Sequence, residues 1–149
     1  MDIYALLMQD HEEVMDLFMQ LEETKGGRRG KGFDALFDQL KNELELHMIG
    51  EEEFFYPALQ EHKEMYAQIL ESREEHHVVS LILDELSAIP KDDRWFAKLA
   101  VLRENVENHI AKEEQDIFPA AEEIIDPGQA ELAGLNMSEM KEAQTAAAR

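Results

Sequence analysis

Two histidine–glutamate pairs are the residues of this sequence whose spacing most clearly indicates chemistry. His47 precedes Glu51 by four residues, and His109 precedes Glu113 by the same interval. Residues at positions i and i+4 lie one above the other on an α-helix, so each pair would present an imidazole and a carboxylate together. Both groups are common ligands of divalent and trivalent cations. The spacing therefore indicates a metal site.

Two further histidines, His11 and His76, lie singly on apolar stripes with helical spacing. Residues 47–58 and 109–120 resemble each other, because both contain His-x-x-x-Glu-Glu followed by an aromatic residue and Pro-Ala. The apolar spacing after His11 also matches that after His76. This internal repeat predicts a helical bundle with an approximate two-fold axis. Six side chains are expected to converge on that axis: His11, His47, Glu51, His76, His109 and Glu113.

Two carboxylates buried among four imidazoles would be costly in a dry core unless metal ions neutralise them. If both glutamates bridge, the six residues supply about eight of roughly twelve ligand positions around two octahedral ions. A bridging oxide or hydroxide would fill two more and leave about two positions for an exogenous ligand. Iron, manganese and zinc suit these ligands, and the histidine content together with open positions favours iron. The simpler alternatives are surface ion pairs within each His–Glu pair and buried histidines without a ligand role.

Apolar residues recur with helical spacing over residues 2–24, 33–55, 64–89 and 94–117. Four such helices with short connections predict an all-α, antiparallel up-down-up-down four-helix bundle over residues 1–125. Glycines between residues 26 and 32 are expected to end the first helix in a basic loop, and Asp92 or Asp93 to cap the last. Residues 126–149 are predicted to form a short C-terminal tail that packs on the bundle or is partly frayed. It begins with a turn at Asp126-Pro127-Gly128, and Asn136 is a candidate cap for a short helix within it.

The composition excludes several classes of function. The 149 residues include 34 Asp and Glu against 14 Lys and Arg, and the formal net charge is −20. Such an acidic surface repels phosphate, so neither nucleic acid nor a membrane surface is an expected partner. The chain contains no cysteine, which excludes disulfides, thiolate metal sites and cysteine nucleophiles. The acidic N-terminal segment and the short apolar runs predict a cytoplasmic protein without a signal peptide or membrane span.

The motifs around these histidines resemble those of the hemerythrin-like family, also called the HHE cation-binding domain. The resemblance covers residues 2–121 and rests on His11, the run from His47 to Pro57, the pair Glu75-His76, and the run from His109 to Pro119. It implies a four-helix bundle with a non-haem di-iron centre. It also implies six metal ligands, namely His11, His47, Glu51, His76, His109 and Glu113, with both glutamates bridging.

One departure from the family pattern concerns the third helix, where oxygen-carrying hemerythrins have a His-x-x-x-His pair. In this sequence the residues four positions from His76 are Ser72 and Ser80. The chain therefore resembles the four-His, two-Glu branch, which argues against reversible oxygen carriage. That branch includes bacterial proteins linked to repair of oxidised or nitrosylated iron–sulfur centres, and domains that sense iron or oxygen.

Several polar residues near the motifs receive other interpretations. His62 and His77 are expected outside the site, and Glu52, Glu53 and Glu114 on an acidic surface. Glu43 and Asn105 each precede a ligand histidine by four residues, and each is either a hydrogen-bond partner of imidazole or a polar residue at the edge of the core.

The leading functional hypothesis is a di-iron protein that binds or senses dioxygen, peroxide or nitric oxide, or that handles iron. The alternatives are an oxidative or nitrosative stress enzyme or iron–sulfur repair factor, and a metal-free interaction bundle. The sequence identifies no protein or redox partner and does not decide whether the protein is an enzyme.

Overall fold

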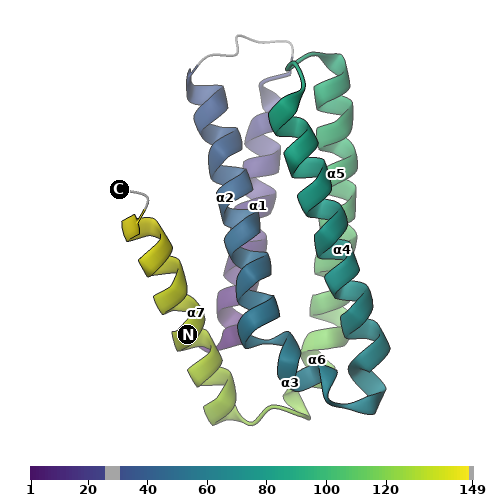
Figure 1. Cartoon of the computed structure of the whole chain (residues 1–149), viewed down its shortest axis with the longest axis vertical. Helices are drawn as coiled ribbons and strands as arrows, with labels where there is room; N and C mark the ends of the chain where they lie inside the picture. Colours follow the sequence, from purple (N-terminus) through teal and green to yellow (C-terminus); the bar gives the residue numbers. More distant parts are fainter. Residues whose placement is uncertain (26–30, 148–149) are drawn as a thin grey trace.

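Long helices packed side by side make up the structure, a computed structural model that describes residues 1–25 and 31–147 apart from the side chain of residue 31. The described residues contain no strand, as the all-α prediction required. The elements are α1 (Ile3–Glu23), α2 (Lys31–Phe54), α3 (Tyr56–Gln60), α4 (Lys63–Ala88), α5 (Asp93–Lys112), the π-helix η1 (Glu113–Ile117), α6 (Phe118–Glu122) and α7 (Pro127–Ala147). Helices α1, α2, α4 and α5 form the bundle, and consecutive members run in opposite directions (Figure 1).

The sequence signals for helix ends agree well with the structure. The carboxylate of Asp2 accepts a hydrogen bond from the backbone N–H of Ala5 at 2.9 Å, and that of Asp92 accepts bonds from the first residues of α5. The predicted cap at Asp92 is therefore confirmed. Pro57 and Pro119 lie in the first turns of α3 and α6, where the missing N–H costs nothing. The predicted basic loop falls mostly on residues 26–30, which lie outside the described residues.

The core has two hydrophobic clusters with a polar layer between them. The larger cluster surrounds Trp95, whose indole N–H donates to the carbonyl of Leu86 at 2.9 Å. The smaller cluster lies toward α3 and α6 and includes Ile3, Leu59 and Ile117. Along each of the four long helices, the predicted site residues fall between the segments that form these two clusters. Packed apolar side chains therefore lie on both sides of the polar layer along the length of the bundle.

The C-terminal segment differs from the prediction of a short tail. Residues 127–147 form one helix of 21 residues, α7, which packs against α1 and α2 (Figure 1). Asn136 lies inside this helix and does not cap it. The helix begins instead at Asp126, whose carboxylate accepts from the N–H of Gln129 at 2.8 Å while the Gln129 side chain accepts from the N–H of Asp126 at 3.0 Å. Because of this reciprocal cap, the segment predicted to be a turn is the start of α7.

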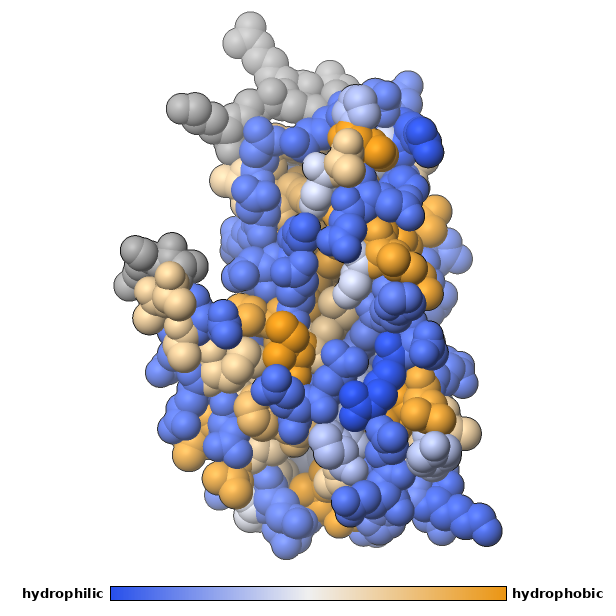
Figure 2. Space-filling view, viewed as in Figure 1, coloured by the Kyte–Doolittle hydropathy of each residue, from blue (hydrophilic) through white to orange (hydrophobic). Residues whose placement is uncertain are grey.

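Hydrophilic side chains dominate the face of the molecule seen in Figure 2, and the apolar side chains there lie in separate patches. Within the residues that the structure describes, no helix is both long and apolar enough to cross a membrane.

Candidate metal centre

The six predicted site residues all lie in the polar layer of the bundle. His11 comes from α1, His47 and Glu51 from α2, His76 from α4, His109 from α5 and Glu113 from η1. Each is at most 6% exposed, and both glutamates are fully buried. The bundle thus brings together residues that are up to 102 positions apart in the sequence. His62 and His77 are exposed, as expected for residues outside the site.

The six residues form two triads, each with two imidazoles and one carboxylate. The first triad consists of His11, His47 and Glu113, and the second of Glu51, His76 and His109. In each triad the potential ligand atoms lie within 4.8 Å of one another, so either triad could hold a metal ion. In the second triad, the Nε2 atoms of His76 and His109 are only 3.2 Å apart.

Each glutamate lies in the triad whose two histidines come from the other half of the repeat. Glu113, from the second half, has Oε1 3.1 Å from His11 Nε2 and Oε2 3.4 Å from His109 Nε2. Glu51, from the first half, has Oε1 3.0 Å from His47 Nε2 and 3.1 Å from His76 Nε2. Each carboxylate therefore reaches histidines of both triads, and each triad draws residues from both halves of the chain.

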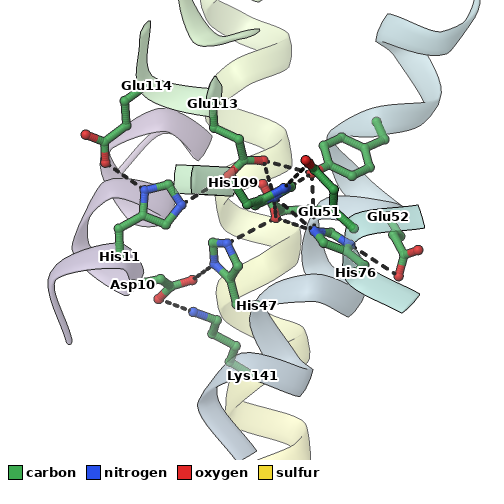
Figure 3. A network of polar contacts seen from close by, with 12 residues as sticks. Asp10, His11, His47, Glu51, Glu52, His76, His109, Glu113, Glu114 and Lys141 are labelled. Atoms are coloured by element: carbon green, nitrogen blue, oxygen red, sulfur yellow. Dashed lines mark hydrogen bonds and ion pairs between the residues drawn. The ribbon is translucent and has the colours of Figure 1, made fainter. Parts of the chain in front are cut away.

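A second ring of carboxylates surrounds the histidines (Figure 3). The Nδ1 atom of His11 pairs with Glu114 at 2.7 Å, and that of His47 with Asp10 at 2.9 Å. The Nδ1 atom of His109 pairs with Glu75 at 2.8 Å, and that of His76 lies 3.8 Å from Glu52. We call Asp10, Glu52, Glu75 and Glu114 the outer carboxylates. In His11, His47 and His109, an Nδ1–H donated outward leaves the inward Nε2 to bind a ligand.

The outer carboxylates contact the predicted site residues but were not themselves predicted from the sequence. Glu52 and Glu114 were predicted to be part of an acidic surface, but each is half-buried and directed toward a histidine (Figure 3). The predicted partners are wrong, because the Glu43 carboxylate accepts from the side chain of Gln39 and the Asn105 amide donates to the carbonyl of Val101.

The signal for the outer carboxylates was present in the repeat. An acid directly precedes each lone histidine, as Asp10 and Glu75, and an acid directly follows each buried glutamate, as Glu52 and Glu114. Because acids occupy equivalent positions in the two halves, the repeat indicates that they make the same kind of contact in each half.

Charge and burial act in opposite directions on the ionisable groups. Burial alone would lower the pKa of His47, but the charge of Glu51 and the hydrogen bond to Asp10 raise it to about 10. The pKa of His109 is raised well above its ordinary value, against the effect of burial, by Glu113 and Glu51. Burial would raise the pKa of Glu51, yet the neighbouring histidines hold it well below the ordinary range. In the metal-free protein Glu51 is thus ionised, and the imidazoles of His47 and His109 hold protons at the centre.

An aromatic ring covers each lone histidine. Phe118 stacks on His11 with ring centroids 6.0 Å apart, and Tyr56 stacks on His76 with centroids 5.4 Å apart. Tyr56 and Phe118 are equivalent in the repeat, but Tyr56 adds a buried hydroxyl that donates to Glu113 Oε2 at 2.8 Å. Burial and the charge of Glu113 raise the pKa of this phenol well above its ordinary value, so it stays protonated.

A small cavity lies against the four histidines. Its remaining lining consists of apolar side chains, namely Val14, Leu44, Met48, Val79, Val106 and Ile110. The centre of a water-sized molecule can occupy about 20 Å³ of this cavity. That space is enough for one water or another small molecule.

A single turn of π-helix begins at Glu113. The predicted continuous helix to residue 117 is instead α5 followed by η1, and the backbone N–H of Phe118 donates to the carbonyl of Glu113, five residues earlier. Such turns are frequent at functional sites because the extra residue redirects a side chain. In the first half, by contrast, α2 ends at Phe54, and Phe55 donates to the carbonyl of Glu51, four residues earlier.

Comparison with known proteins agrees with this arrangement. The hemerythrin HHE cation binding domain family matches residues 2–121. The chain is similar to a solved structure, the hemerythrin HHE cation binding domain-containing Rv2633c homolog from Mycobacterium kansasii, with 26% sequence identity and a TM-score of 0.79. The similarity covers 96% of this chain and 86% of the other. No curated protein matches the chain. From the family match, the repeat and the buried triads, we conclude that the chain belongs to the hemerythrin HHE cation-binding domain family.

Proposed function

We propose that the protein carries a non-haem di-iron centre and uses it to bind or sense a small ligand such as dioxygen, nitric oxide or peroxide. The proposed ligands are His11, His47, Glu51, His76, His109 and Glu113, with one ion per triad and an oxide or hydroxide bridge. The observation that carries the proposal is the juxtaposition of the two triads with a cavity sized for one small molecule.

The donor atoms fit a pair of cations. Glu113 extends one oxygen toward each triad, which suits a bridging carboxylate. The second oxygen of Glu51, Oε2, is buried and has no hydrogen-bond partner among the described residues. An ionised oxygen in that state is costly unless a cation binds it. Imidazole and carboxylate ligands without thiolate are those of non-haem iron, with manganese and zinc as competitors.

The chain's own groups prepare the site for a small ligand. Bound iron would supply electrons and open coordination positions. The apolar lining beside the histidines excludes bulk water and strengthens electrostatic interactions at the cavity wall. The outer carboxylates fix the orientation and tautomer of the histidines. The Tyr56 hydroxyl, held by Glu113 and 3.3 Å from His76 Nε2, provides a proton donor at the second triad.

A direct test loads the purified protein with ferrous iron in the absence of oxygen and then measures metal content. We expect two iron ions per chain. Nitric oxide is then titrated while the optical spectrum is recorded, followed by dioxygen on a separate sample. A stoichiometric spectral change that saturates supports ligand binding.

Three results would contradict the proposal. If metal stays absent after anaerobic loading, the metal-free interaction bundle is the correct alternative. If peroxide or nitric oxide is consumed continuously with an added reductant, the protein is an enzyme and not a sensor. Zinc or manganese in protein from iron-supplemented medium, with poor exchange for iron, would overturn the metal assignment.

A further inference from the structure

In each half of the centre a lysine contacts an outer carboxylate, but the two lysines come from different helices. In the second half, Lys112 of α5 lies three residues after His109 and contacts Glu75 Oε2 at 2.9 Å. The other oxygen of Glu75 pairs with His109 Nδ1 at 2.8 Å. Lysine, outer carboxylate and histidine thus form a chain of contacts that leads into the second triad.

The position of the first half that is equivalent to Lys112 is Gly50, which has no side chain to contact an outer carboxylate. A Cβ at Gly50 would lie 2.8 Å from the sulfur of Met137 in α7, so the glycine leaves room for the Met137 side chain against α2. Small residues recur on the inner side of α7, since a Cβ at Gly134 would collide with the carbonyl of Met1. The C-terminal helix therefore lies close to α1 and α2.

This close packing brings Lys141 of α7 to Asp10. The Lys141 ammonium donates to Asp10 Oδ1, and Asp10 Oδ2 pairs with His47 Nδ1 at 2.9 Å (Figure 3). Lys141 and Asp10 are 131 residues apart, yet they reproduce the chain of contacts formed by Lys112, Glu75 and His109. Asp10 is 7% exposed, so the lysine neutralises a carboxylate that is largely removed from water.

We propose that α7 completes the first triad, and that Lys141 is a positioning residue that holds His47 through Asp10. This inference rests on the proposed metal site. When α7 is docked, Lys141 and His47 bind opposite oxygens of Asp10 and fix its carboxylate. When α7 separates, the carboxylate loses its lysine and can turn toward water, which releases the His47 ring. By thermodynamic linkage, metal bound in the first triad must in turn favour the docked helix.

The experiment compares Lys141→Met with the matched variant Lys112→Met, using anaerobically added Fe²⁺ as the probe. Iron affinity is measured by competition with a chromogenic chelator, and docking of α7 by amide hydrogen exchange with and without Fe²⁺. In the wild type and in Lys112→Met, we expect Fe²⁺ to slow exchange in α7. In Lys141→Met, we expect that protection to disappear and one of the two ions to bind about 10- to 100-fold more weakly.

Two further variants separate this role from a general loss of structure. Gly134→Ala keeps Lys141 but pushes α7 away from the start of α1, and it should reproduce the Lys141→Met result. Lys141→Arg should restore most of the protection because it keeps the cation. The inference is overturned if the wild type binds two ions but Fe²⁺ does not protect α7, or if Fe²⁺ protects α7 equally in Lys141→Met and Lys112→Met. Absence of iron from the wild type would instead overturn the metal site itself, and this inference with it.

Discussion

The hydroxyl of Tyr56 donates a 2.8 Å hydrogen bond to Oε2 of Glu113, which links the start of α3 to the π-helical turn after α5. The equivalent residue of the other half, Phe118, has the same stacking role but no hydroxyl. The internal symmetry is therefore broken at this contact, because only one half of the repeat supplies a hydroxyl to the centre.

Replacement of Tyr56 by Phe tests the energetic role of this bond. The variant keeps the stacked ring and leaves a buried carboxylate oxygen without its donor, so we expect metal-free protein to lose about 1–3 kcal/mol of unfolding free energy. Urea denaturation in the presence of a chelator measures the loss. Tyr66→Phe is the matched control, because Tyr66 is 51% exposed and its replacement should change little. Equal stability of both variants would show that the hydroxyl contributes nothing.

Glu51→Gln tests the bridging role of the buried carboxylates. The amide has the same shape but neither the charge nor two equivalent oxygens, and we expect iron binding to fall by at least about 100-fold. Glu53→Gln, two residues away and exposed, should retain wild-type metal content. Equilibrium dialysis against ferrous iron under nitrogen compares the two. Comparable iron in both proteins would remove Glu51 from the ligand set.

Val79→Leu tests the cavity beside the histidines. The added methylene would occupy part of the small space, at a cost of about 1–3 kcal/mol if the core cannot adjust. We expect iron content to stay unchanged while nitric oxide binds more slowly or more weakly. Val78→Leu is the neighbouring control, since Val78 is 42% exposed. Stopped-flow mixing with nitric oxide gives the rates, and identical rates in the two variants would place the ligand elsewhere.

The free energy of unfolding of the metal-free protein should fall as the pH rises into the alkaline range. The pKa of His47 is 6.5 in an unfolded chain and about 10 in the folded protein, and those of His76 and His109 are also raised. Between these limits the folded state retains protons that the unfolded state has released. The stabilisation is therefore complete below pH 6.5 and is lost as the pH rises toward 10, by at most about 1.4 kcal/mol per pH unit for each proton.

Urea denaturation at several pH values across this window measures the slope. His47→Gln should flatten it, while His62→Gln, at an exposed position, should leave it unchanged. Iron-loaded protein should show a smaller slope because the metal replaces the protons. A metal-free protein with constant stability from pH 6.5 to 10 would contradict the charged state described for the histidines.

Local sequence patterns sufficed for the long helices and for the six central residues. Apolar spacing fixes which helix face is buried, and His47 and Glu51 share that face because they are four residues apart. The exchange of Glu51 and Glu113 between triads could not be predicted, because it depends on how far each side chain extends past the axis. The outer carboxylates were missed for a related reason. Asp10 and Glu114 lie beside the apolar stripe, where the rotamer decides between water and a histidine.

The full length of the C-terminal helix was not predicted from the sequence, for a different reason. Its inner side is built from Ala130, Gly134 and Met137, so the usual sign of a packed helix, a stripe of large apolar residues, is absent. Close approach of small residues and the reciprocal cap at Asp126 stabilise it instead. Neither feature produces a strong periodic signal.

The exchange of glutamates has a consequence for how the protein unfolds. The α1–α2 hairpin holds two histidines of one triad, and the α4–α5 hairpin holds those of the other, but each depends on a carboxylate from the opposite hairpin. A hairpin that detached would remove a ligand from both triads at once. Metal binding energy is therefore added to the interface between hairpins and not to either hairpin alone. In the loaded protein the two hairpins should open together in one cooperative step, although each resembles a repeat that could have folded separately.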